Sequence, residues 1–150
     1  MRSLLFVPGD SEKKLEKSLA SGADALIIDL EDSVAAANKP AARALARDFI
    51  ARVKRNATRP RLIVRVNALD GDLTDDDVAV VTPAAPDAIM LPKAQSGGDV
   101  QHLSNKIAVA EAQSDLADGA IRIIPIATET ASAIFNLGSY AGCSDRLDGL

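Results

Sequence analysis

Short apolar runs alternate with amphipathic segments along the whole chain. The runs predict five strands, at residues 3–7, 24–30, 61–66, 88–91 and 121–126. Apolar side chains recur at helical spacing between them, at about residues 12–21, 40–56, 73–81, 99–116 and 131–140. Residues 147–150 predict the start of a sixth strand. Because strand and helix alternate about every 30 residues, we predict right-handed crossovers and a parallel α/β sheet.

The second strand carries the densest group of charges at its end. The stretch DALIIDLEDSV begins as a buried apolar run and then places Asp29, Glu31 and Asp32 within four residues. Carboxylates at the mouth of a buried strand are costly unless cations or backbone N–H groups pair with them. These three residues are therefore either held in ion pairs or placed to do chemistry.

Polar side chains also follow the later strands. Arg65 and Asn67 follow the third strand, Lys93 follows the fourth, and Thr128 and Glu129 follow the fifth. The carboxyl ends of parallel strands meet at one edge of the sheet, so these residues are expected to converge there. The sequence therefore predicts a functional site at this edge, although buried ion pairs that only tie the loops together would give the same pattern.

The residue types at this edge restrict the chemistry. Carboxylates with an arginine and a lysine suit Mg²⁺ binding and recognition of an anionic ligand. His102 is the only histidine, which disfavours a Ser-His-Asp or Cys-His arrangement. The loop after the first strand, PGDS, has a single glycine and matches no phosphate-binding motif. The run at 75–77 is better explained as a helix N-terminus than as a metal cluster.

The amino-acid composition indicates the class of protein, its partners and its cellular compartment. The chain has 150 residues, 47% hydrophobic and 25% charged, which suits one globular domain. A net charge of −4 without a long basic run disfavours nucleic acid as a partner. A single cysteine, Cys143, indicates a reducing compartment, and no apolar run approaches the roughly 20 residues that span a bilayer. The apolar run in MRSLLFVPGD is too short for a signal peptide, so we expect a cytoplasmic protein without a membrane partner.

Four motifs in order carry a family resemblance: LLFVPGDSEKKLEKSLASGADALIIDLEDSV, RLIVRVNAL, AIMLPKA and IPIATETASAIF. Together they cover nearly the whole chain and resemble the HpcH/HpaI aldolase/citrate lyase family, in particular the citrate lyase β-subunit-like acyl-CoA lyases. The resemblance implies a TIM (β/α)8 barrel that binds Mg²⁺ and joins or cleaves an acyl-CoA and a 2-oxo acid. Citryl-CoA, malyl-CoA and citramalyl-CoA are the implied substrates, and a homo-oligomer, a trimer or hexamer, is the implied assembly.

The resemblance also assigns roles to individual residues. Glu129 in ATET matches a metal-binding glutamate, and Arg65 in VRVN matches the catalytic arginine that holds the oxo-acid carboxylate and polarises its carbonyl. The other candidates line the substrate or support the ligands: Asp29, Glu31, Asp32, Asn67, Lys93 and Thr128.

Length is the main departure from the family pattern. The family places a second metal ligand, an aspartate, after strand six, and a general acid or base near the C-terminus that reaches a neighbouring subunit. A whole barrel needs about 250 residues. We therefore expect residues 1–150 to be the N-terminal part of a single TIM-barrel domain, an incomplete barrel of about five βα units. Its unpaired sheet edges would favour self-association, and it would be weakly active or inactive alone.

Two other functions remain open from the sequence. Five βα units would also complete a flavodoxin-like or receiver-like signalling domain, in which Asp29–Asp32 and Lys93 form a Mg²⁺-assisted phospho-acceptor site. Alternatively, the chain is a non-catalytic binding subunit that docks onto a complementary half.

Overall fold

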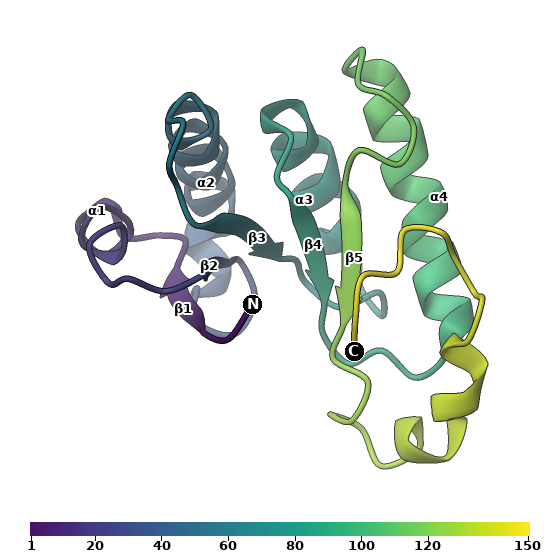
Figure 1. The fold of residues 1–150 in the computed structure, drawn as a ribbon. Coiled ribbons are helices and arrows are strands. Elements are labelled where there is room, and N and C mark those ends of the chain that lie inside the picture. The colour runs from purple at the N-terminus through teal and green to yellow at the C-terminus, as the bar shows by residue number, and fades with distance from the viewer.

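The computed structural model describes residues 1–150 as a curved parallel sheet covered by helices (Figure 1). Five strands lie side by side in the order in which they occur along the chain: β1 (Leu4–Pro8), β2 (Ala25–Asp29), β3 (Arg61–Arg65), β4 (Ala88–Leu91) and β5 (Arg122–Pro125). All four neighbouring pairs are parallel, as the repeat of strand and helix predicts.

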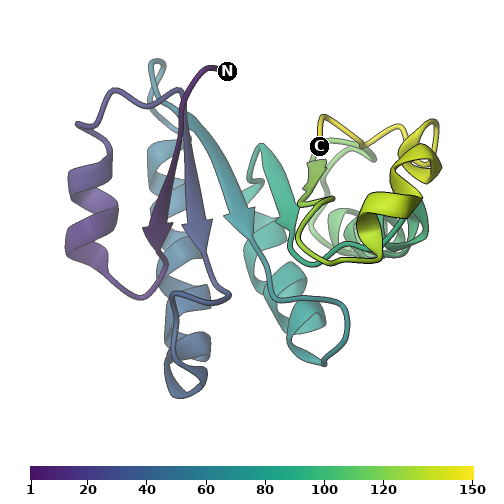
Figure 2. The ribbon, with the colours of Figure 1, turned by 90° about the horizontal axis from the view of Figure 1, so that it is seen from below.

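The helices lie in an arc along one side of this sheet (Figures 1 and 2). They are α1 (Glu12–Ser18), α2 (Lys39–Val53), α3 (Leu73–Val81) and α4 (Gly97–Gln113). Three 3₁₀ segments complete the regular structure, at Ala36–Asn38, Thr82–Ala84 and Ala133–Tyr140. None of the helices has the length and apolar character needed to cross a membrane.

The sequential strand order identifies the sheet as an arc of a barrel. A flavodoxin-like or receiver-like sheet has the order 2-1-3-4-5 and helices on both faces, whereas here the order is 1-2-3-4-5 and the helices lie on one face. The signalling-domain alternative is therefore not supported. The strands are part of a TIM-type barrel, in which the concave side of the sheet faces the barrel interior.

Alternate residues along each strand separate two apolar clusters. One set packs against the helices in a cluster of 28 buried residues that includes Leu26, Ile28 and Val64. The other set faces inward and forms a smaller cluster of five: Ala25, Ile27, Ile63, Ala88 and Met90. Because both faces of the central strands are buried, successive residues along these strands are apolar and form continuous apolar runs in the sequence.

The predicted elements agree with the structure in the middle of the chain. The segments 73–81 and 88–91 coincide with α3 and β4, and the other strands and helices differ by a few residues at their ends. The predicted sixth strand is confirmed at one position, where Leu147 forms a parallel bridge to Ile123 in β5.

The helix predicted at 131–140 is confirmed over Ala133–Tyr140, but it is a 3₁₀ helix and not an α-helix. Side chains in this segment compete for backbone groups. The Asn136 amide donates to the Gln95 carbonyl (3.1 Å), and the Ser139 hydroxyl donates to the Asn136 carbonyl (2.6 Å). The Ser139 bond is local and offers the backbone an alternative to a regular α-helix, whereas the Asn136 bond ties the segment to the residues before α4.

A buried ion pair fastens α4 to the chain on either side of β5. Both nitrogens at the end of Arg146 donate to the Glu111 carboxylate, at 2.9 and 2.7 Å, and both side chains are buried. The backbone N–H groups of Gly119 and Ile121 donate to the same carboxylate. Burial by itself raises the pKa of Glu111, but the bonds from Arg146 and the two amides outweigh it and lower the pKa.

We expect Glu111→Gln to lower the free energy of unfolding by about 2 kcal/mol, because the buried guanidinium of Arg146 loses its only buried charged partner. Urea denaturation monitored by circular dichroism measures the change. Asp118→Asn is the matched control, since Asp118 also pairs with Arg146 but is 88% exposed, and it should cost less than about 1 kcal/mol. Equal losses in the two variants would contradict the importance of burial.

Candidate active site

Asp29 and Arg65 form the centre of the site at the carboxyl ends of β2 and β3. They are direct partners in the parallel register, and both lie on the inner side of the sheet. Arg65 donates from Nε to Oδ1 of Asp29 (2.8 Å) and from Nη2 to Oδ2 (2.7 Å). This two-bond fork fixes the plane of the guanidinium.

The Asp29 carboxylate is also held by its own loop. The backbone N–H groups of Glu31 and Ser33 donate to its two oxygens, at 2.9 and 3.1 Å. Burial by itself raises the pKa of Asp29, but the bonds from Arg65, Ser33 and Glu31 lower it to about 2. The same bond to Asp29 raises the pKa of Arg65, so both groups are charged at neutral pH.

The free end of Arg65 points toward Glu31. Its Nη1 atom lies 3.1 Å from Oε2 of Glu31, and the side chain of Arg65 is 14% exposed. The planar guanidinium also lies over the ring of Phe6 in β1, with 4.8 Å between Cζ and the ring centroid. Since Asp29 uses only two of the five N–H donors, Arg65 retains donors for an incoming anionic group.

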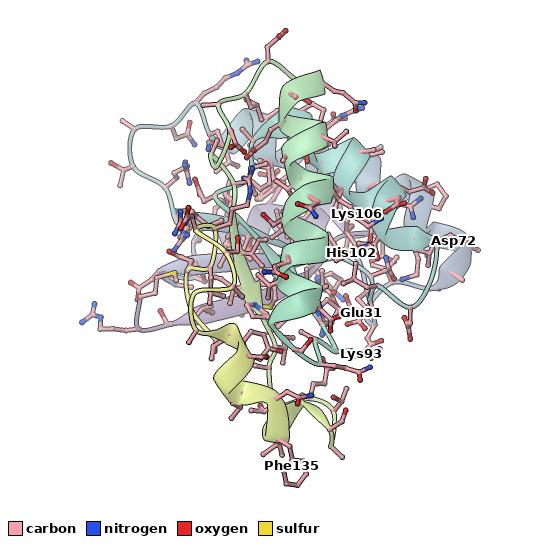
Figure 3. The ribbon with its side chains drawn as sticks, turned by 90° about the vertical axis from the view of Figure 1, so that its right-hand side faces the viewer. Glu31, Asp72, Lys93, His102, Lys106 and Phe135 are labelled. Carbon is pink, nitrogen blue, oxygen red and sulfur yellow. The ribbon has the colours of Figure 1, made fainter.

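Glu31 joins Arg65 to Lys93, which follows β4. Nζ of Lys93 lies 2.6 Å from Oε1 of the buried Glu31 and 3.7 Å from Oδ1 of the exposed Asp32. Figure 3 shows Glu31 and Lys93 together near the N-terminal end of α4. The bond to Glu31 raises the pKa of Lys93. His102 lies on α4, is exposed, and forms no hydrogen bond with this group.

The backbone of Lys93 extends the site to the end of β5. Its N–H donates to Oε2 of Glu129 at 2.6 Å. Lys93 has φ of 53°, the left-handed conformation that non-glycine residues seldom adopt, directly after Pro92. Residues held in such conformations cluster at functional sites. Thr128 and Glu129 are both exposed at this rim.

A cavity of about 330 Å³ opens beside this group. Its lining residues come from the loops after β3, β4 and β5 and include Leu69, Asp70, Lys93, Gln95 and Thr130. The volume is at the lower end of the range for small-molecule sites, which is consistent with a small polar ligand.

Asn67 is the one predicted residue that the structure directs away from the rim. Its amide donates to Oδ2 of Asp77 in α3 (2.6 Å) and to the Leu30 carbonyl (3.1 Å), and its Oδ1 accepts from Lys39 (2.7 Å). Arg43 completes this buried network by pairing with Asp77. Asn67 therefore supports the loop beneath the site.

The sequence reasoning missed Lys39, Arg43 and Asp77. Lys39 and Arg43 are four residues apart on α2, where a charged pair among alanines looks like a solvated face. The structure instead buries both side chains, and Lys39 donates to the carbonyls of Leu30 and Glu31 at 2.8 and 3.0 Å. The acidic run 75–77 does begin a helix, as predicted, but only Asp75 and Asp76 lie in its first turn.

Comparison with known proteins shows the family. A family model described as HpcH/HpaI aldolase/citrate lyase matches residues 2–150. The chain belongs to the HpcH/HpaI aldolase/citrate lyase family. The resemblance carried by the four sequence motifs is thereby confirmed, and the family consists of aldolase and lyase enzymes.

Individual relatives agree with the family assignment. The chain is 31% identical to citrate lyase subunit beta of Leuconostoc mesenteroides over 149 residues, 99% of this chain and 48% of that protein. It is 42% identical to a (3S)-malyl-CoA thioesterase of Cereibacter sphaeroides over 106 residues, 71% of this chain and 36% of that protein. The chain thus spans half or less of the length of these HpcH/HpaI relatives.

A solved HpcH/HpaI structure supports the fold. The chain is similar to the CitE protein of Mycobacterium tuberculosis, crystallised with magnesium and pyruvate, with a TM-score of 0.72 and 30% identity. The match covers 97% of this chain and 51% of that structure. It agrees with the partial TIM barrel deduced from the strand order.

The rim residues fit a divalent cation of the kind found in that relative. Four carboxylates (Asp29, Glu31, Asp32 and Glu129) meet two cations (Arg65 and Lys93), which leaves two negative charges uncompensated. Oε2 of Glu31 is buried and has no hydrogen-bond partner, since its 3.1 Å approach to Arg65 lacks hydrogen-bond geometry. No three carboxylate, histidine or cysteine side chains gather closely enough to hold an ion by themselves. Mg²⁺ commonly keeps water and substrate oxygens among its ligands, so this set suits it.

Two carboxylates whose pKa values are lowered to about 2 predict a loss of stability in acid. Asp29 has a pKa of about 2, and so does Asp87, where burial is outweighed by the bonds from Arg59 and the Leu62 N–H. A lowered pKa stabilises the fold above the unfolded-state value near 4, and this stability is lost as pH falls toward 2. We expect the free energy of unfolding to fall by about 2 kcal/mol per carboxylate across this range.

Urea denaturation at pH 7, 4, 3 and 2 measures this loss. Asp29→Asn should remove the loss of about 2 kcal/mol that is due to Asp29, while leaving the parts due to Asp87 and Glu111. An unchanged pH dependence in that variant would contradict the role of Asp29.

Proposed function

We propose that the chain is part of a Mg²⁺-dependent carbon–carbon lyase that cleaves a 3-hydroxyacyl-CoA into an acyl-CoA and a 2-oxo acid. Citryl-CoA, malyl-CoA and citramalyl-CoA are the substrate class. The observation that carries the proposal is the continuous chain of contacts from Asp29 through Arg65, Glu31 and Lys93 to Glu129 at the sheet edge. It joins an anion-binding guanidinium to a cation-binding group of carboxylates.

In this proposal Arg65 binds the carboxylate of the 2-oxo acid portion and donates to its keto oxygen. Asp29 holds the guanidinium in one plane, so that its remaining N–H groups are aimed before the substrate arrives. Cleavage requires that the 3-hydroxyl proton pass to a base, the role that the resemblance gives to the group near the C-terminus of the full-length protein. The electrons of the breaking carbon–carbon bond go to the thioester as an enolate, which takes up a proton to give the acyl-CoA, while the hydroxyl oxygen becomes the keto oxygen of the 2-oxo acid. Arg65 stabilises charge on that oxygen without having to reorient.

Glu129 is the proposed metal ligand among these residues. When bound, Mg²⁺ would supply Lewis-acid stabilisation of the substrate oxygens and a template for their orientation. The Lys93 N–H occupies one oxygen of Glu129 and leaves the other available. Glu31 and Asp32 are proposed to orient water or the guanidinium, while Lys93 and Thr128 line the approach to the site.

We further propose that residues 1–150 form the N-terminal part of a single TIM-barrel domain that works as a homo-oligomer, a trimer or hexamer. β1 has no strand on its outer edge, and β5 has only the single bridge to Leu147. Sheet edges of this kind favour pairing with further strands. The 150 residues alone should therefore bind ligands but turn over weakly or not at all.

The test uses the protein at the full length of its relatives with Mg²⁺ and each of the three thioesters. We expect release of an acyl-CoA and a 2-oxo acid, with activity lost in EDTA and restored by Mg²⁺. Release of free CoA thiol without a 2-oxo acid would instead assign a thioesterase, and no turnover of any thioester would refute the lyase.

The same ligands can be tested on residues 1–150 by thermal shift. Binding of Mg²⁺ with pyruvate stabilises the folded state by mass action, so the melting temperature should rise. A shift in this chain together with no turnover at full length would favour the binding-subunit alternative.

A further inference from the structure

Phe6 occupies the position directly beneath the guanidinium of Arg65. Phe6 is the partner of Ile27 in the parallel register, and Ile27 belongs to the inner apolar cluster, so the ring is on the barrel-facing side of β1. Arg65 lies two strands away on β3, two residues beyond Ile63, which is level with Phe6 in the register. The ring centroid is 4.8 Å from Cζ of Arg65, within the range of a cation–π interaction.

Three groups together hold the guanidinium of Arg65, along two of its edges and over one face. The Asp29 carboxylate holds its Nε and Nη2 edge, Oε2 of Glu31 lies near Nη1, and the Phe6 ring covers one face. The two hydrogen bonds to Asp29 prevent the guanidinium from rotating within its own plane. They still allow this plane to tilt relative to the Asp29 carboxylate. The ring opposes that tilt because the cation is attracted to the centre of the ring face.

We infer that Phe6 is a positioning residue that sets the tilt of Arg65, and through it the direction in which Arg65 binds the substrate carboxylate. This inference rests on the proposed function of Arg65. An aliphatic side chain would serve equally well in a role of packing alone.

The experiment compares Phe6→Leu with Phe6→Tyr and Phe6→Trp in the full-length protein. Loss of the ring should lower kcat/KM between about 2- and 30-fold, the range that a cation–π interaction of this kind supplies. The two aromatic variants keep the ring face and should stay within about 2-fold of the parent. Leu4→Ala is the matched control. Leu4 is also exposed and lies on the same face of β1, but it is two residues before Phe6 and so further from Arg65.

A double-mutant cycle separates positioning from a structural role. In the Arg65→Gln background the ring has no cation to hold, so Phe6→Leu should cause no further loss. The same fold-loss in both backgrounds, or equal losses in the leucine and aromatic variants, would overturn the inference. If Arg65→Gln itself leaves turnover unchanged, the proposed function fails, whereas a large effect of Arg65→Gln with none from Phe6→Leu refutes the positioning role alone.

Discussion

Glu129→Gln is expected to lower Mg²⁺-dependent turnover of the full-length protein by at least about 10³-fold, because Lewis-acid stabilisation of charge supplies several kcal/mol. The substitution removes the negative charge but keeps an oxygen that can accept the Lys93 N–H. The fold should therefore be preserved. Steady-state kinetics across a range of Mg²⁺ concentrations measures the effect.

A binding measurement makes the test of Glu129 independent of activity. The rise in melting temperature that Mg²⁺ causes in residues 1–150 should be reduced in Glu129→Gln. Asp72→Asn makes the same chemical change at an exposed position before α3, away from Glu31 and Lys93, and should leave both turnover and the Mg²⁺ response unchanged (Figure 3). Turnover retained in Glu129→Gln would refute its assignment as the metal ligand.

Arg65→Lys is expected to lower kcat/KM by about 10² to 10³-fold, the usual cost of removing a donor that stabilises developing negative charge. Lysine keeps the positive charge but cannot bridge both Asp29 oxygens and also bind a substrate carboxylate. The loss should appear with a weaker affinity for pyruvate, measured by calorimetry in the presence of Mg²⁺.

Arg61→Lys provides the control for that experiment. Arg61 lies at the opposite end of β3 and pairs with Asp148 at 2.5 Å, far along the strand from the rim. Turnover should remain close to the parent value. Similar losses in the two variants would show that the strand is sensitive to any change of arginine, which would remove the argument for a specific role of Arg65.

Much of the site can be predicted from the sequence because strand ends are local features. Asp29, Glu31, Arg65, Lys93 and Glu129 each follow an apolar run, and parallel strands bring such ends to one edge. Asn67 satisfies the same rule yet points elsewhere, because its backbone N–H and its side-chain amide both donate to the buried Asp77 carboxylate in α3, at 2.7 and 2.6 Å. Position after a strand predicts the edge but not the direction of the side chain.

The helix predicted at 131–140 shows a similar limit of prediction from sequence, because its 3₁₀ geometry depends on distant residues. Its apolar spacing is helical, but Asn136 and Ser139 find backbone partners in and beyond the segment, including the Gly97 N–H that donates to the Ser139 hydroxyl at 2.9 Å. Gln95 and Gly97 lie just before α4 and at its first residue, more than 35 residues away. Local periodicity contains no information about them.

The sequence by itself determined the alternation of strand and helix, the parallel sheet and the residue types at its edge, because each depends on side-chain periodicity within a short segment. The family resemblance of the four motifs also predicted an incomplete barrel, which the sequential strand order confirmed. Only the tertiary structure decided that Glu31 pairs with a lysine 62 positions later. It also decided that Phe6 lies under Arg65. The physical reason is that strand order and register fix which distant side chains meet, and both follow from the packing of the helices on one face of the sheet.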